Sequence, residues 1–247
     1  MARQAPQRDV APAVQRLRLR YAKRGRLRFS SHRDFQRALE RAVRRAQIPI
    51  AMSAGFSPHP KISYANAAPT GAASEAEYVE IAVTAPCEPE SVREALDSTL
   101  PPGLDVLEVV EARTPDFAAR LEASVWQIEF PGLSDLHRAV EAFGAAGEIE
   151  VERLTKSGMR RFDARQAVLA MDLQSPQSGA RGEGCAILTV VIRHGTPSVR
   201  PDDVITALRL VADLVPPKPP RVTRLAQGPL DAAGTSVTDP LTPDKVG

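Results

Sequence analysis

The chain has 247 residues, of which 43% are hydrophobic and 25% charged, so it has the composition of an ordinary globular protein with enough apolar residues for a core. Its two cysteines, Cys87 and Cys185, match neither a Cys-x-x-Cys nor a Cys/His spacing, which argues against a disulfide framework, structural zinc and an iron–sulfur cluster. The net charge of +2 hides an asymmetry, because residues 1–61 hold 15 Lys and Arg against 3 Asp and Glu.

The ends of the chain are poor in structural signals. The opening residues lack the apolar core of a signal peptide, and no later run reaches the roughly 18 to 20 apolar residues that span a bilayer, so we expect a cytoplasmic protein without a membrane segment. Residues 1–14 are polar and without periodicity, and residues 227–247 are rich in turn formers. Both stretches are predicted to be disordered.

Residues 16–23 are predicted to form the first strand, because apolar and basic residues alternate strictly along them. Three arginines share one side of this strand and are expected on the open face of a sheet: Arg16, Arg18 and Arg20. Several modules for single-stranded RNA use such a face to hold phosphates and stack bases. The alternative, equally supported, is cross-strand ion pairing with Glu77 or Glu80.

A basic amphipathic helix is predicted next, from the N-cap Ser31, with Asp34 three residues on, to about Gln47. The following Ile48-Pro49 step ends it. Arginines at helical spacing share the face opposite the apolar residues: Arg33, Arg37, Arg41, Arg44 and Arg45. Such a face is more often simply solvated, but here it coincides with the basic segment 1–61.

The segment 55–61, Gly-Phe-Ser-Pro-His-Pro-Lys, has the most unusual local composition in the chain. Two prolines stiffen it, and three side chains supply a stacking ring, a titratable ring and a charge: Phe56, His59 and Lys61. The blander interpretation is a rigid surface turn whose Phe56 plugs the core. His59 and His32 are also candidate general acids or bases, although no metal-ligand spacing accompanies them.

Further strands at 61–66, 78–84 and 104–112 and a helix at 89–100 complete the order β-α-β-β-α-β. In a ferredoxin-like unit of this order, two helices cover one face of an antiparallel sheet. The order recurs after a link at 114–120, with strands at 124–130, 148–155, 168–173, 186–193 and near 221–225 and helices at 133–143 and 201–214. Segment 163–172 fits an extra strand or a short helix. We therefore predict an α+β protein with two tandem ferredoxin-like units, 15–113 and 121–226.

The run from 16 to 81, with GFSPHPKIS and SEAEYVEI, resembles the radical-SAM-associated protein family. That family is a domain of unassigned mechanism, found behind radical SAM proteins in many bacteria and free-standing in actinobacteria. The similarity continues more loosely at FDAR (162–165) and RPDDV (200–204). Because the chain has no Cys-x-x-x-Cys-x-x-Cys, the resemblance implies a partner of a radical SAM enzyme and not the enzyme itself.

Two further likenesses bear on function. In actinobacteria, genes of the resembled family neighbour those of ribonuclease E/G and ribosomal proteins, which implies a role with RNA. In fold alone, tandem ferredoxin-like units with a basic helix are similar to CRISPR repeat-processing endoribonucleases, a likeness that confers no activity.

The predicted function is an RNA-binding or RNA-handling adaptor without a cofactor or metal, acting beside RNA-processing enzymes. The residues assigned to the RNA are Arg16, Arg18, Arg20, Arg33, Arg37, Arg41, Phe56, His59 and Lys61. Two alternatives remain open: a metal-independent ribonuclease or modified-nucleotide-processing enzyme using His32 or His59, and a protein–protein module for a radical SAM partner. The absence of Walker, G-x-S-x-G and H-E-x-x-H motifs lowers the case for an enzyme.

Overall fold

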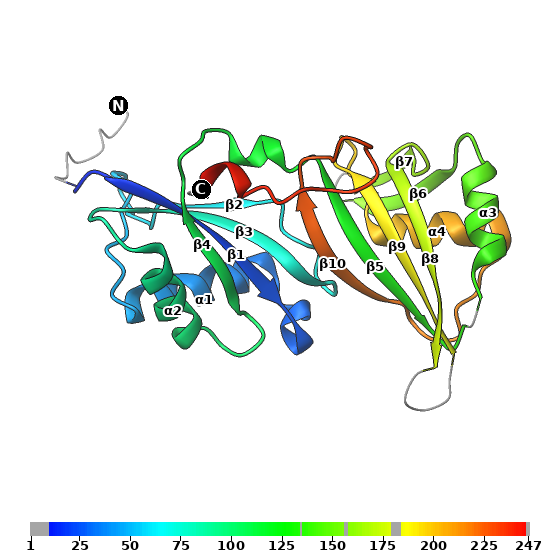
Figure 1. Ribbon diagram of the computed structural model, residues 1–247, viewed down its shortest axis with the longest axis horizontal. Coiled ribbons are helices and arrows are strands. Elements are labelled where there is room, and N and C mark those ends of the chain that lie inside the picture. Colours follow the sequence, from blue (N-terminus) through cyan, green and yellow to red (C-terminus); the bar gives the residue numbers. More distant parts are fainter. Residues whose placement is uncertain (1–9, 134, 156–157, 179–183, 246–247) are drawn as a thin grey trace. The chain divides into compact units, whose positions relative to one another are not determined.

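The structure, a computed structural model, describes residues 10–133, 135–155, 158–178 and 184–245. The chain forms two compact units: the first comprises the residues up to Ala118 together with the segment from Leu241, and the second is Ala119–Pro240. Helices and antiparallel strands are mixed in both, which confirms the α+β class (Figure 1). None of the described helices is long and apolar enough to cross a membrane.

The first unit has the element order strand, helix, strand, strand, helix, strand. The bounds are β1 (Gln15–Lys23), α1 (His32–Arg45), β2 (Ile62–Ala65), β3 (Ala73–Val83), α2 (Pro89–Thr99) and β4 (Val106–Glu111). Short 3-10 helices lie at η1 (Gly25–Phe29), η2 (Phe117–Arg120) and η3 (Thr242–Asp244). The strands lie in the order β4-β1-β3-β2, and each pairing is antiparallel.

Both helices of the first unit lie on the same side of its sheet (Figure 1). The core there joins apolar residues of β1, including Leu17 and Leu19, to Phe35 and Leu39 of α1. The rings of Tyr21 and Phe35 stack with centroids 4.1 Å apart, a contact worth about 1 kcal/mol beyond the burial of area. Because side chains alternate along a strand, the arginines of β1 lie on the face away from the helices.

The second unit contains β5 (Ala123–Pro131), α3 (His137–Ala145), β6 (Glu150–Thr155), β7 (Gly158–Asp163), β8 (Val168–Ser178), β9 (Gly184–Arg193), α4 (Pro201–Ala212) and β10 (Arg221–Gly228). Four of its strands pair in the order β10-β5-β9-β8, and β6 pairs with β7 in a separate hairpin. Segment 163–172, which the sequence left unassigned, spans the end of β7, a turn and the start of β8.

The stretch from 227 onward differs from its expectation of disorder. Strand β10 continues to Gly228, and the side chains of Leu241 and Asp244 are buried. Within the second unit, Nη1 of Arg120 donates to the carbonyl of Pro240 at 3.1 Å. Local composition underrated this stretch because a few long-range contacts fix it. Residues 1–9 of the predicted N-terminal arm and residues 246–247 lie outside the described residues.

Candidate nucleic-acid interface

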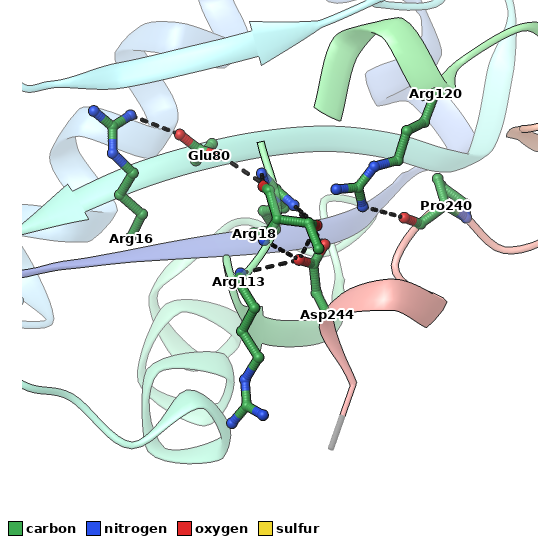
Figure 2. A network of polar contacts seen from close by, with 8 residues as sticks. Arg16, Arg18, Glu80, Arg113, Arg120, Pro240 and Asp244 are labelled. Carbon is green, nitrogen blue, oxygen red and sulfur yellow. Dashed lines mark hydrogen bonds and ion pairs between the residues drawn. The ribbon is translucent and has the colours of Figure 1, made fainter. Parts of the chain in front are cut away.

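The three arginines of β1 differ in what their guanidinium groups contact. Nη1 of Arg16 lies 2.8 Å from Oε1 of Glu80, and Nε of Arg18 lies 3.1 Å from Oε2 of the same carboxylate (Figure 2). Nε of Arg20 donates to the backbone carbonyl of Glu75 at 2.9 Å. The cross-strand pairing with Glu80 that the sequence offered as an alternative is therefore present for two of the three.

Arg18 is almost wholly enclosed, with 3% of its surface exposed. Its guanidinium also donates to Oδ2 of Asp244 at 2.5 Å and to Oγ1 of Thr114 at 3.2 Å, and it lies 4.9 Å from the ring centroid of Phe117. An external phosphate cannot reach Arg18 while these partners stay in place. Arg16, with 61% of its side chain exposed, is open to solvent.

The arginine face of α1 is exposed, as its spacing predicted: Arg33, Arg37, Arg41, Arg44 and Arg45. Among the described residues, Arg44 is the one member of this face in an ion pair, with Nη2 3.8 Å from Oε2 of Glu40. Hydrogen bonds from the hydroxyl and backbone N–H of Ser31 lower the pKa of Asp34, and the charge of Arg37 adds a smaller effect. The helix thus presents several guanidinium groups to solvent.

The loop after α1 is closed by its own polar groups. Oγ of Ser53 lies 2.9 Å from Nδ1 of His59 and accepts the backbone N–H of His59 at 3.1 Å. Because Nδ1 is engaged, Nε2 is the ring nitrogen left for a ligand. Lys61 is exposed, and so is Phe56 at 55%. The interpretation in which Phe56 plugs the core is therefore wrong.

His32 is the first residue of α1 and has its own set of contacts. Its ring meets that of Tyr64 edge-on at 4.8 Å, and its Nε2 lies 3.0 Å from Nε2 of Gln36. Burial raises the pKa of the Tyr64 hydroxyl, which has no hydrogen-bond partner within the described part of the chain. No contact between described residues joins His32 to His59, so the structure does not bring the two candidate histidines together as a catalytic pair.

A cavity of about 440 Å³ lies on the face of the first sheet opposite the helices α1 and α2. Its lining includes Arg16, Arg18, Glu80, Thr114, Pro115 and Phe117. The volume falls within the range of small-molecule sites, and the lining combines charged groups with an aromatic ring. This cavity is separate from the exposed face of α1, because the helices pack on the other side of the sheet.

Sequence reasoning missed two polar clusters. One is centred on Asp244, whose partner Arg18 is 226 residues away, a separation that no local pattern encodes. The other is His194, whose Nε2 lies 2.7 Å from Oγ of Ser124 and whose Nδ1 lies 2.6 Å from the carbonyl oxygen of Leu121. Burial, and to a smaller extent the charge of Arg224, lowers the pKa of His194.

Metal-binding groups do not gather in the described residues. Within those ranges no set of three or more His, Cys, Asp or Glu side chains is arranged to hold a metal ion. Cys87 and Cys185 are both free thiols, and burial raises the pKa of Cys87.

The chain is similar to one protein family over most of its length. The model of a family described as "Uncharacterized protein conserved in bacteria (DUF2344)" matches residues 16–201. The match includes β1, α1, the 55–61 loop and most of the second unit. No curated protein matches the chain.

Proposed function

Since the chain belongs to the DUF2344 family of uncharacterized bacterial proteins, we propose that it is an adaptor that binds single-stranded RNA through α1 and the 55–61 loop. The observation that carries this proposal is the exposed face of α1, whose guanidinium groups are almost free of ion pairs within the described residues. Solvated cations without internal partners are available to phosphates, and binding releases the counterions that the RNA had condensed.

The burial pattern narrows the residues proposed for the RNA. Arg18 is enclosed and Arg20 donates to a backbone carbonyl, so they contribute less than their place on β1 predicted. Arg16 is set aside because it pairs with Glu80. The residues retained are Arg33, Arg37, Arg41 and Lys61 for phosphates and Phe56 and His59 for a base, and we add Arg45, which is exposed on the same face of α1. The ring of Phe56 is 55% exposed and follows the cationic helix α1 in the sequence. Such a ring is suited to stacking on an unpaired base.

The proposal also covers the fold type of the two units and the protein partner of the adaptor. We assign both units to the ferredoxin-like type, because β4-β1-β3-β2 and β10-β5-β9-β8 are equivalent strand orders once the β6–β7 hairpin is treated as an insertion. The protein partner is a radical SAM enzyme or a ribonuclease, as the resemblance of segment 16–81 implies. The adaptor would present RNA to that enzyme.

Titration of a fluorescent single-stranded RNA tests the proposal. If about five phosphates are neutralised, the logarithm of affinity falls against the logarithm of salt concentration with a slope of about −3.5. The double variant Arg37→Gln/Arg41→Gln should weaken binding about 20-fold at about 0.1 M salt and flatten the slope by about 1.4.

The matched control is Arg138→Gln/Arg209→Gln, which removes two exposed arginines from helices α3 and α4 of the second unit. It should leave affinity and slope unchanged. A salt slope near zero for the wild type, or equal losses of RNA affinity in the two double variants, would contradict the proposal.

The bond between Ser53 and His59 favours a second candidate function, a metal-independent ribonuclease. The contact at Nδ1 holds the imidazole in place and leaves Nε2 for proton transfer to or from a ribose hydroxyl. In that case His59→Ala abolishes cleavage of bound RNA and leaves affinity nearly unchanged, as a quenched-flow cleavage assay beside the anisotropy titration would measure. Loss of affinity without any wild-type cleavage supports the adaptor instead.

A further inference from the structure

The carboxylate of Asp244 lies in a nest of hydrogen-bond donors on the face of the first sheet opposite the helices α1 and α2. Its Oδ1 accepts the backbone N–H groups of Arg113 at 2.9 Å and Thr114 at 3.0 Å and the hydroxyl of Thr114 at 2.5 Å. Its Oδ2 accepts Nη1 of Arg18 at 2.5 Å. The side chain of Asp244 is fully buried, so these protein donors replace its hydration (Figure 2).

The donors come from β1 and from the loop that follows β4. Arg18 is in the middle of β1, and Arg113 and Thr114 directly follow β4. Two successive backbone N–H groups, a hydroxyl and a guanidinium aimed at one point are the chemistry with which proteins bind phosphate. The arrangement therefore suits an anion with more oxygens than a carboxylate.

The present occupant belongs to a short segment near the end of the chain. In segment 241–245, Leu241 is buried, Asp244 fills the nest, and Nζ of Lys245 lies 2.6 Å from Oε1 of Glu108. Lys245 and Asp244 also line a second cavity of about 350 Å³. A segment this short can leave its place without disturbing the strands beneath it.

Space for the rest of a ligand adjoins the nest. Arg18 and Thr114 are part of the nest and also line the 440 Å³ cavity, which contains the exposed Arg16 and the ring of Phe117. That volume accommodates a nucleoside. The cavity is on the opposite side of the sheet from α1, so the site is independent of the proposed RNA surface.

We propose that Arg18, Thr114 and the backbone N–H of Arg113 form a phosphate-binding site, which Asp244 occupies as an internal substitute until a phosphorylated small molecule displaces it. The phosphate takes the place of the carboxylate, and the remainder of the ligand lies in the 440 Å³ cavity. Binding of the ligand thereby releases segment 241–245.

Anion rescue of Asp244→Ala in the full-length protein tests the site. The substitution leaves buried donors without an acceptor and should lower Tm by about 10 °C. Inorganic phosphate at about 10 mM, roughly a hundredfold above the Kd of a weak anion site, should restore most of the lost Tm. Chloride at equal ionic strength should not. Asp244→Ala/Thr114→Val, which lacks the hydroxyl donor, should recover less.

Rescue by adenosine monophosphate and by adenosine, each compared with inorganic phosphate, shows whether the ligand is a phosphorylated small molecule or the free anion. Stronger rescue by the monophosphate than by inorganic phosphate, with none by adenosine, supports a ligand that fills the cavity. Equal rescue by monophosphate and inorganic phosphate assigns the site to the free anion. If Asp244→Ala responds to phosphate no more than to chloride, the site does not exist and Asp244 is only a structural contact.

Hydrogen exchange on the wild-type protein gives a readout that does not depend on the stability of the variant. Phosphate should speed exchange of the Asp244 and Lys245 amides, which donate within η3, and should leave the Arg113 and Thr114 amides protected. Unchanged exchange at Asp244 and Lys245 in saturating phosphate would overturn displacement. Because α1 takes no part in this measurement, its outcome is distinguishable from failure of the RNA proposal.

Discussion

His194 shows how one residue fixes a protonation state. A backbone carbonyl can only accept, so Nδ1 of His194 carries the proton that it donates to Leu121. Nε2 is then the acceptor for the hydroxyl of Ser124. A second proton would have to be placed on Nε2, where it would remove that acceptor in a half-buried site near Arg224. The neutral ring is thus the form that the folded protein stabilises.

This residue makes the free energy of unfolding depend on pH. Burial lowers the folded pKa of His194 below its ordinary value of 6.5, so the unfolded chain takes up the proton first. The stabilising contribution is fully present above pH 6.5 and is lost as pH falls from there through the folded pKa. Chemical denaturation of wild type and His194→Gln at several pH values measures it.

The His194→Gln variant should be less stable at pH 7 and should show a flatter pH dependence just below 6.5. His137→Gln is the control, because His137 is an exposed histidine at the start of α3. A pH dependence that is the same in wild type and His194→Gln would contradict the assignment of the neutral ring.

The arginines show what a residue-level pattern can and cannot reveal. Strict alternation placed Arg16, Arg18 and Arg20 on one face of β1, which is where they lie. Alternation carries no information on partners, and the enclosure of Arg18 depends on Asp244 from the far end of the chain. On α1 the reverse holds, since helical spacing alone was enough to predict an exposed face.

At the scale of the element, the two ends of α1 differ in how far local chemistry predicts them. Ser31 and Asp34 form the reciprocal bonds of a capping box, and the sequence predicted this N-terminus closely. The C-terminus came earlier than predicted, at Arg45, because Gln47 has left-handed backbone angles with φ of 54°. Glycine is the usual residue at such a position, so a glutamine there does not signal the end of a helix.

Replacing Gln47 by glycine should therefore stabilise the protein. Glycine relieves the steric cost of positive φ, which exceeds the extra entropy that it gives the unfolded chain, and the expected net gain is about 0.5 kcal/mol. Urea denaturation measures the change. The control Ala46→Gly, at a neighbouring position with right-handed angles, should cost about 0.5 to 1 kcal/mol. Destabilisation by Gln47→Gly would contradict the strain.

Strand β7 is the element that the sequence missed. Four of its six residues are exposed, so it lacks the alternation of apolar and polar residues by which strands are recognised. It is held by its hairpin partner β6, through pairs such as Leu154 with Met159. Hairpin pairing depends on a neighbouring strand, which the pattern of β7 alone does not reveal, and residues 156–157 lie outside the described residues.

At the scale of the whole molecule, the order of helices and strands along the sequence was more predictable than the long-range contacts between them. The succession of strands and helices follows from periodicity, and the class is α+β as expected. The return of the segment from Leu241 to the first unit follows from no local signal, because its partners, such as Arg18 at Asp244 and Glu108 at Lys245, are far away in the sequence. Local composition cannot predict long-range ion pairs of this kind.

The central claim concerns the whole molecule, since it places RNA binding on one of the two units. Ultraviolet crosslinking of the full-length protein to single-stranded RNA, followed by mass spectrometry of the crosslinked peptides, tests it most directly. The account predicts that crosslinks concentrate within residues 33–61, with Phe56 prominent among them. Crosslinks confined to Ala119–Pro240, or none at a concentration where anisotropy reports binding, would contradict it.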